Sequence, residues 1–282
     1  MNIAITGANG FIGKNLIKSL IKLPYQVNAI IRNSDCEKVI SKNIKYTLLD
    51  YKKSNSQTFN LLGKPDVLVH LAWSNLDDYN SVNHLEVELE NSYNFLEQMI
   101  NSGVKNIIVA GTCFEYGLKE GILYETDKAD PQNYYSEAKD ILRTRLEKIK
   151  KLKNFKMTWM RIFYVYGAGQ KKNTIYSQLN QAISNHNSEF NMSLGDQTRD
   201  FLHVDELSNK IKKLILTNND NGIVNICSGI EKTIKLIVSE WIKNNNWNIK
   251  LNLGYYQYQK NEPMHFYGCN KKYKYLKKFI KN

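Results

Sequence analysis

The sequence predicts an α/β protein built on a doubly wound parallel sheet. Short apolar runs alternate with helical patterns through the first two-thirds of the chain, which is the order of a sheet with helices on both faces. The turn after the first apolar run carries regularly spaced glycines, and no internal repeat or low-complexity linker interrupts the order. A chain of 282 residues, 42% of them hydrophobic, is long enough for one large domain with a smaller lobe.

Six apolar runs are expected to form the strands of this sheet, at residues 2–6, 26–31, 44–49, 66–71, 106–111 and 156–163. The clearest helical stretches lie between them, at 10–22, 79–101 and 134–152. After Gly167 the alternation stops. We therefore expect a larger domain of residues 1–166 plus about 200–227, and a smaller, interleaved C-terminal lobe of about 167–199 plus 228–282.

Charge and cysteine content exclude several function classes. The formal net charge is +12, but the lysines are spread along the chain and no RNA-binding motif accompanies them, so we expect an anionic small-molecule ligand and no nucleic acid. Cys36, Cys113, Cys227 and Cys269 have no metal-ligand spacing, and neither a metal site nor a disulfide is expected. No apolar run approaches the ~18 residues of a membrane span. A strand from Asn2 would leave no room for a signal peptide, so we expect a cytoplasmic protein.

The first turn is typical of a dinucleotide site. Residues 3–13 read IAITGANGFIG, with Gly7, Gly10 and Gly13 directly after a strand and at the start of a helix. Glycine allows a tight turn and a close approach to a pyrophosphate, and the following helix presents free N–H groups to it. A tight turn without a ligand is the alternative. The pattern favours a Rossmann-type fold whose cofactor contacts include the other loop residues Asn9, Phe11 and Ile12.

The end of the second strand indicates which dinucleotide binds. An acidic residue about 20 residues beyond the glycines would bind the ribose 2′-hydroxyl of NAD. This chain has Arg32 there, and a guanidinium suits a 2′-phosphate that a carboxylate would repel. NADP(H) is therefore favoured over NAD(H), unless Arg32 lies along the adenine or points to solvent. Asp50, at the end of the third strand, is a candidate adenine contact, with a turn or capping role as the alternative.

A tyrosine and a lysine share one helical face in the run NYYSEAKD (133–140). Tyr135 and Lys139 are four residues apart, whereas Tyr134 lies off that face. A nearby ammonium would lower the tyrosine pKa from ~10, so that Tyr135 could exchange a proton with a substrate oxygen. The same spacing occurs on ordinary surface helices, but behind a glycine turn of this type it indicates a catalytic pair.

With these features the chain resembles the extended short-chain dehydrogenase/reductase family, in its nucleotide-sugar epimerase/dehydratase/reductase branch. The resemblance covers nearly the whole length and rests on TGANGFIG (6–13), DVLVHLA (66–72), GTCFEYG (111–117), YSEAK (135–139), RIFYVYGAGQ (161–170) and GDQTRDFLHVDEL (195–207).

The resemblance assigns roles to further residues. It places Thr112 where a Ser or Thr hydrogen-bonds the reacting oxygen, and Lys139 where a lysine also holds the nicotinamide ribose. Leu71 and Ala72 are expected to contact the cofactor. Arg199 falls where an arginine commonly binds the nucleotide diphosphate, as a guanidinium can do bidentately, with an ion pair to Asp200 as the alternative.

Three departures from the family pattern concern the substrate. The family often has Asn where this chain has Tyr164, Asn near Glu88, and a second alanine where it has Trp73. We expect Trp73 and Tyr164 to narrow the pocket around a sugar, with packing between the lobes as the alternative.

The two residues after Thr112 bear on the reaction. The dehydratases that the chain resembles carry Asp-Glu at this point, which protonate a leaving hydroxyl and remove a proton, whereas this chain has Cys113 and Phe114. A 4,6-dehydration is therefore not expected. A nucleophilic Cys113 would need a basic neighbour, and no local histidine supplies one. We expect Cys113 and Phe114 to shape the substrate pocket, and the sequence assigns no role to Glu115.

The resemblance predicts NADPH-dependent reduction of the C4 keto group of a nucleotide-linked 4-keto-6-deoxyhexose, in deoxysugar or cell-surface polysaccharide biosynthesis. GTCFEYG is similar to the corresponding stretch of dTDP-4-dehydro-6-deoxyglucose reductases. The alternative is an NAD-dependent nucleotide-sugar 4-epimerase. A cofactor-sensing or RNA-binding protein on an inactive scaffold is disfavoured by the intact Thr112, Tyr135 and Lys139. The resemblance also implies a homodimer, formed through the helices 79–101 and 134–152.

Overall fold

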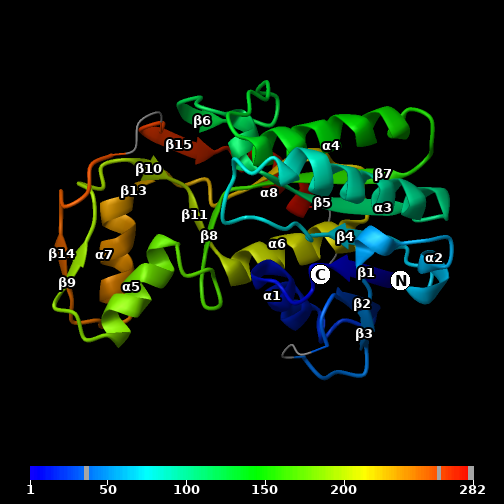
Figure 1. Ribbon diagram of the computed structural model, residues 1–282, viewed down its shortest axis with the longest axis horizontal. Coiled ribbons are helices and arrows are strands. Elements are labelled where there is room, and N and C mark those ends of the chain that lie inside the picture. Colours follow the sequence, from blue (N-terminus) through cyan, green and yellow to red (C-terminus); the bar gives the residue numbers. More distant parts are fainter. Residues whose placement is uncertain (35–37, 259–261, 279–282) are drawn as a thin grey trace.

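A seven-stranded, entirely parallel sheet forms the larger part of the protein, seen here in a computed structural model that describes residues 1–34, 38–258 and 262–278 (Figure 1). From one edge to the other its strands are β12 (Gly222–Ile226), β7 (Lys156–Ile162), β5 (Asn106–Thr112), β4 (Val67–His70), β1 (Asn2–Thr6), β2 (Gln26–Ile31) and β3 (Ile44–Leu48). The predicted doubly wound α/β architecture is confirmed.

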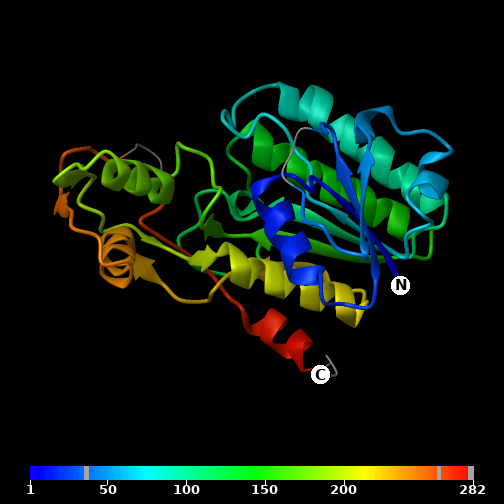
Figure 2. The same cartoon turned by 90° about the horizontal axis from the view of Figure 1, so that it is seen from below.

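Helices cover both faces of this sheet. On one face α1 (Phe11–Leu20) and α6 (Val204–Thr217) pack side by side over a core that includes Ile5, Leu16 and Ile211 (Figure 2). On the other face, α3 (Leu89–Asn101) and α4 (Tyr134–Lys150) pack over a second core, to which they contribute Phe95 and Leu142. Strands buried on both faces are apolar along their whole length, which is why the sequence shows continuous apolar runs rather than alternation.

The strand order reverses at β1, because β2 and β3 lie on one side of it and β4, β5 and β7 on the other. In open parallel sheets a ligand binds beyond the carboxyl ends of the strands at such a reversal. The glycine turn after β1, the Leu71–Ala72 stretch after β4 and Thr112 at the end of β5 therefore meet at one edge.

The smaller lobe lies at that edge (Figure 1). Its helices α5 (Ile175–Ser184) and α7 (Ile234–Asn244) pack around a separate core that includes Leu179 and Trp241. Three small sheets accompany them: β13 (Lys232–Thr233), β10 (Thr198–Arg199), β15 (His265–Gly268) and β6 (Gly121–Leu123); β8 (Tyr164–Tyr166) and β11 (Phe201–His203); β9 (Glu189–Asn191) and β14 (Lys250–Asn252).

The chain crosses between the two parts several times. β12 returns to the large sheet beside β7, and α8 (Lys271–Lys277) packs against β12 rather than on the smaller lobe. Figure 2 shows α8 beneath α6, away from α5 and α7. The site is therefore built from segments distant in sequence.

One helix begins later than its pattern predicts. The stretch expected as helix 79–101 starts with turns, continues as the π-helix η2 (His84–Glu88) and becomes regular only in α3. The helical spacing of apolar residues begins at Leu85, so the preceding residues have no apolar face to hold them against the sheet. A 3₁₀ turn η1 (Tyr51–Lys53), the short helix α2 (Thr58–Leu61) and a 3₁₀ turn η3 (Cys113–Tyr116) complete the elements. Within the described part of the chain, no helix is long and apolar enough to cross a membrane.

Candidate active site

A cleft of about 1020 Å³ opens at the carboxyl edge of the large sheet and continues against the smaller lobe. Its lining brings together most of the residues singled out from the sequence: the glycine turn, Arg32, Trp73, Thr112, Tyr135, Lys139 and Arg199. This volume is at the upper end of small-molecule sites, which span ~300–1,000 Å³.

The glycine turn has the shape that a pyrophosphate requires. Gly7 has φ +68°, and a Cβ added there would lie 2.9 Å from the Ala72 nitrogen; one added at Gly13 would lie 2.2 Å from the Gly7 carbonyl oxygen. Gly10 caps α1 without any side-chain hydrogen bond, and no acidic residue lies in the first turn. The first N–H groups of α1 are thus left to an anion, so these residues fit a dinucleotide. Asn9, Phe11 and Ile12 line the cleft beside them.

Thr6 fixes the backbone that lines the cleft beside the glycine turn, a role that sequence reasoning missed. Its Oγ1 accepts hydrogen bonds from the Leu71 and Ala72 nitrogens, at 3.2 Å each, and lies 2.9 Å from His70 Nδ1. Burial lowers the pKa of His70 to about 3, so its ring is neutral. Leu71 and Ala72 are thereby held against the glycine turn.

Arg32, predicted to select the cofactor, and Asp50, a candidate adenine contact, differ in placement. Arg32 is exposed at the end of β2, and its Nη1 donates to Ser74 Oγ at 3.4 Å. Asp50 has the alternative role that the sequence left open, because its carboxylate caps η1 by accepting from the Lys52 nitrogen at 3.2 Å. Tyr51, rather than Asp50, lines the cleft at this point.

Thr112, Tyr135 and Lys139 come together as the motifs predict. Thr112 is the last residue of β5, and its side chain hydrogen-bonds Tyr135 in the first turn of α4. Lys139 follows one turn later, 2% exposed, and its Nζ donates to the Ala110 carbonyl oxygen at 2.8 Å. The same Nζ lies 3.7 Å from the ring centroid of Trp73 and 5.9 Å from that of Tyr135.

The electrostatics of this pair correct the sequence prediction. A lysine-lowered pKa was expected for Tyr135, but burial raises its pKa, and the hydrogen bond with Thr112 opposes this only in part. Burial also lowers the pKa of Lys139 to about 7, against the opposing effect of Glu115 and Glu88. Desolvation disfavours the charged form of each group, and it is the largest influence on both pKa values. Tyr135 is therefore a protonated phenol, suited to giving a proton.

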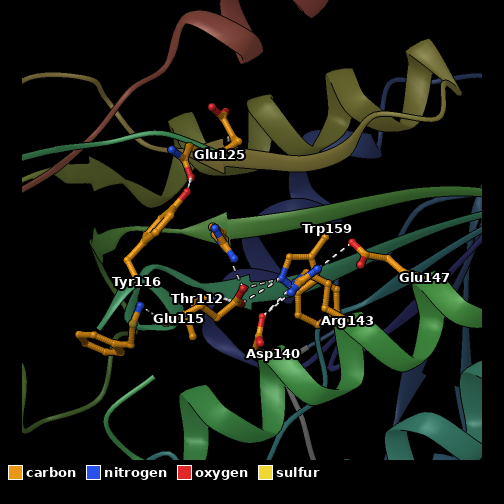
Figure 3. A network of polar contacts seen from close by, with 11 residues as sticks. Thr112, Glu115, Tyr116, Glu125, Asp140, Arg143, Glu147 and Trp159 are labelled. Atoms are coloured by element: carbon orange, nitrogen blue, oxygen red, sulfur yellow. Dashed lines mark hydrogen bonds and ion pairs between the residues drawn. The ribbon is translucent and has the colours of Figure 1, made fainter. Parts of the chain in front are cut away.

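Behind Thr112 lies a buried charged network that the sequence did not reveal (Figure 3). The Glu115 carboxylate accepts from the Thr112 nitrogen at 2.9 Å, from Trp159 Nε1 at 2.9 Å and from Arg161 Nε at 2.8 Å, and Glu115 and Thr112 form a reciprocal capping box at η3. Burial raises the pKa of Glu115, and Arg161 acts in the opposite direction. The ion-pair partner Arg161 lies on β7, 46 residues from Glu115, so no local pattern could have indicated the ion pair.

The two residues after Thr112 shape the cleft. Cys113 is 2% exposed, and burial raises the pKa of its thiol, which is the opposite of what a nucleophile needs. Phe114 lies with its ring centroid 5.4 Å from Tyr79 and 5.8 Å from Tyr164. Tyr164 lines the cleft and packs in turn on Phe201, its register partner in the β8–β11 sheet, at 5.5 Å.

Arg199 lines the cleft from the smaller lobe and is 3% exposed. Its guanidinium does not pair with Asp200: Nη2 lies 3.4 Å from Glu262 Oε2, and Nη1 donates to the Pro263 carbonyl oxygen at 2.8 Å. Asp200 instead accepts from the Ser228 nitrogen at 2.7 Å. Glu262, 63 residues from Arg199, was not found from the sequence because no motif contains it.

In the part of the chain that the structure describes, no cluster of His, Cys, Asp or Glu could hold a metal ion. Cys113, Cys227 and Cys269 are buried free thiols, and Cys36 lies outside the described residues.

Comparison with known proteins gives the family. Residues 3–227 match the model of the NAD dependent epimerase/dehydratase family. A dTDP-6-deoxy-L-talose 4-dehydrogenase (NAD(+)) of Aggregatibacter actinomycetemcomitans is 30% identical over 252 residues, covering 89% of this chain and 93% of that protein. A GDP-6-deoxy-D-talose 4-dehydrogenase of the same organism is 28% identical over 236 residues, covering 82% of this chain and 75% of that protein.

The fold is similar to that of UDP-N-acetylglucosamine 4-epimerase from Methanobrevibacter ruminantium, with a TM-score of 0.84 and 20% identity over 98% of this chain and 91% of the epimerase. The glycine turn, the Tyr135–Lys139 pair and these matches together define a nicotinamide-dependent enzyme of the short-chain dehydrogenase/reductase class. The chain belongs to the NAD dependent epimerase/dehydratase family.

Proposed function

We propose that the protein is an NADPH-dependent reductase of the C4 keto group of a nucleotide-linked 4-keto-6-deoxyhexose. Two relatives are named as 4-dehydrogenases of nucleotide-linked 6-deoxytaloses. A 4-dehydrogenase oxidises the same carbon that the proposed reductase reduces. A third relative, at 26% identity, is named dTDP-4-dehydro-6-deoxyglucose reductase. These names support a nucleotide sugar as substrate and C4 as the reacting carbon.

One observation carries the proposal: Thr112, Tyr135 and Lys139 meet in the cleft, and the two residues that follow Thr112 are a buried thiol and a phenyl ring, neither of which is a carboxyl acid or base. Such a site can move one proton at one oxygen. Elimination of a hydroxyl would need a second acid and a base next to Thr112. Reduction of a ketone needs only the acid, and a nicotinamide cofactor supplies the hydride when bound.

The residues divide the work at the carbonyl oxygen. Tyr135 gives its phenolic proton to the oxygen as negative charge develops there. The Thr112 oxygen accepts a hydrogen bond from the Phe114 nitrogen, at 3.2 Å, so the hydrogen that Thr112 directs at Tyr135 is the one it can turn toward the same substrate oxygen. Transfer leaves Tyr135 as a phenolate, which the ammonium form of Lys139, one helical turn away, stabilises until a proton from solvent returns to it.

Arg32 supports NADP(H) as the cofactor. The guanidinium stands exposed at the end of β2, and Asp50, at the end of the neighbouring strand, is engaged in the cap of η1. A 2′-phosphate would gain an ionic partner there.

The experiment is an assay with dTDP-, GDP- and CDP-linked 4-keto-6-deoxyhexoses, with NADPH and NADH compared at equal concentration. We expect NADPH to be consumed in step with product, and Tyr135→Phe to lower kcat by about 10²–10⁴-fold because the general acid is lost. Unchanged turnover by Tyr135→Phe would refute the mechanism. Faster consumption of NADH would refute the role of Arg32.

The same assay decides between reduction and the alternative, 4-epimerisation. An epimerase would interconvert two nucleotide sugars without net loss of reduced cofactor. That result would replace the reductase proposal.

A further inference from the structure

Trp73 lies across the ammonium group of Lys139. The indole follows β4 and the Leu71–Ala72 stretch, and its ring centroid is 3.7 Å from Lys139 Nζ. Its ring also meets the Tyr135 ring edge-on, with centroids 6.1 Å apart. Among the described residues no carboxylate forms an ion pair with Lys139, and the hydrogen-bond acceptor found for Nζ is the Ala110 carbonyl oxygen. The face of an aromatic ring is therefore the nearest negative potential beside that carbonyl.

The indole itself is held in place from the opposite side. Trp73 Nε1 donates to His84 Nδ1 at 3.0 Å, and His84 Nε2 lies 2.9 Å from the Asp78 carbonyl oxygen. These two partners require that Nδ1 accepts and Nε2 donates, which is one neutral tautomer of His84. His84 is fully buried at the first residue of the π-helix η2, and its ring stacks on the indole at 24°.

The backbone after Trp73 is fixed by the other end of the same π-helix. The Ser74 nitrogen donates to Glu88 Oε2 at 3.1 Å, and Glu88 is 1% exposed and paired with Lys52. Ring and backbone of this stretch are thus both anchored on η2. A side chain that only contacted a sugar would not need this double anchoring.

We propose that Trp73 is a positioning residue, which holds the Lys139 ammonium by a cation–π contact while His84 fixes the plane of the indole. The role rests on the proposed function, since Lys139 matters as the partner of Tyr135. An aromatic partner keeps the ammonium charged without using its N–H donors in an ion pair, so the donors stay available to ligand hydroxyls. The alanine that the family usually has at this position could not do this.

The charged and titratable groups around Lys139 determine in which direction its pKa moves when the Trp73 ring is removed. Glu115 of η3 and Glu88 of η2 favour the ammonium form, while His70 of β4 is neutral and Tyr135 precedes it on α4. Burial is the largest influence and lowers the Lys139 pKa to about 7. A ring face stabilises the charged form, so removing it lowers this pKa further.

The test is a thermodynamic cycle that needs neither cofactor nor substrate. The free energy of unfolding is measured by urea titration across a pH series for wild type, Lys139→Met, Trp73→Leu and the double variant. A lysine with a lowered pKa costs stability below its unfolded pKa, and this cost fades as pH rises through the window between the two values. The onset is the pH at which this stability cost begins to decrease. We expect the onset to lie about one pH unit lower when Trp73 is replaced by leucine.

Matched variants separate positioning from packing. Trp73→Phe keeps a ring face and should restore part of the shift, and His84→Leu should move the onset in the same direction as Trp73→Leu but less. Trp247→Leu, at a partly buried residue that packs against the core of the smaller lobe, should leave the onset unchanged. An onset at the same pH in wild type and in Trp73→Leu would overturn the role of Trp73, whereas a wild-type protein without turnover on keto sugars would refute the proposed function instead.

Discussion

Two groups to which we assign catalytic roles, Thr112 and Lys139, are supported in opposite ways. Behind Thr112 lies an ion pair, Glu115–Arg161, with both side chains almost fully buried and tied to the Thr112 backbone. In front of Lys139 lies an aromatic plane, Trp73, held by a neutral histidine. The first support is charged and the second is not, although the group that needs support is neutral in the first case and cationic in the second.

The difference follows from what each group must do. Thr112 needs only a position, and charge-assisted hydrogen bonds give a rigid position because unpaired partners would be costly. Lys139 must keep its positive charge and leave its N–H donors available to a ligand. A carboxylate at ion-pair distance would neutralise the charge and occupy the donors. The two supports can be broken separately, which gives three predictions in order of size.

The largest effect is expected at the charged support. Glu115→Leu leaves the Arg161 guanidinium buried without a counter-charge, and we expect a loss of about 3–5 kcal/mol in the free energy of unfolding at neutral pH. The measurement is urea denaturation.

The paired variant Glu115→Leu/Arg161→Met is the matched control. It removes both charges together, so we expect it to recover most of the lost stability. If the single and the double variant were equally unstable, the ion pair would not be the source of the loss. Turnover should remain low in the double variant, because the Thr112 nitrogen has lost its acceptor.

The contrast also explains what the sequence could predict. The strands, the glycine turn and the Tyr135–Lys139 pair follow from local patterns of apolar residues, glycines and helical spacing, and the structure has them at or within a few residues of the expected bounds. Both supports depend on partners far along the chain: Arg161 is 46 residues from Glu115, and Lys52 is 36 residues from Glu88, the anchor of the aromatic support. A single sequence carries no pattern for such pairs.

Burial was the other quantity that could not be read from the residues. Spacing predicted a lysine that lowers the pKa of Tyr135, and the structure has desolvation as the larger influence on both groups. His84 and Trp73 are 11 residues apart and could have been paired only by knowing that η2 turns back over the end of β4.

A medium effect is expected from crowding the charged support. A Cβ added at Gly111 would lie 2.2 Å from Trp159 Nε1 and 2.5 Å from Glu115 Oε1, in ordinary strand backbone. Gly111→Ala should therefore cost about 1–3 kcal/mol through overpacking, because both neighbours are fixed by hydrogen bonds to each other. Thermal and urea unfolding measure it. A variant as stable as wild type would show that the network can shift, and that its position is not rigid.

The smallest effect is expected at the anchor of the aromatic support. The Glu88 carboxylate is buried, which alone would raise its pKa, but the contacts with Lys52 and the Ser74 nitrogen leave the pKa below its ordinary value. A carboxyl with a lowered pKa adds stability above its unfolded pKa of ~4.3, and this stability is lost as pH falls through the folded value. Glu88→Gln should therefore cost about 1 kcal/mol at neutral pH, a modest loss since Lys52 is partly exposed to solvent.

The pH dependence makes this prediction specific to the charge of Glu88. The difference between wild type and Glu88→Gln should narrow under acid, as the wild-type carboxyl takes up its proton and both side chains become neutral. Glu86→Gln, two residues earlier on an exposed position of η2, is the matched control and should change stability little at any pH. A difference that stayed constant from neutral to acid pH would mean that the shape of the Glu88 side chain, not its charge, anchors Ser74.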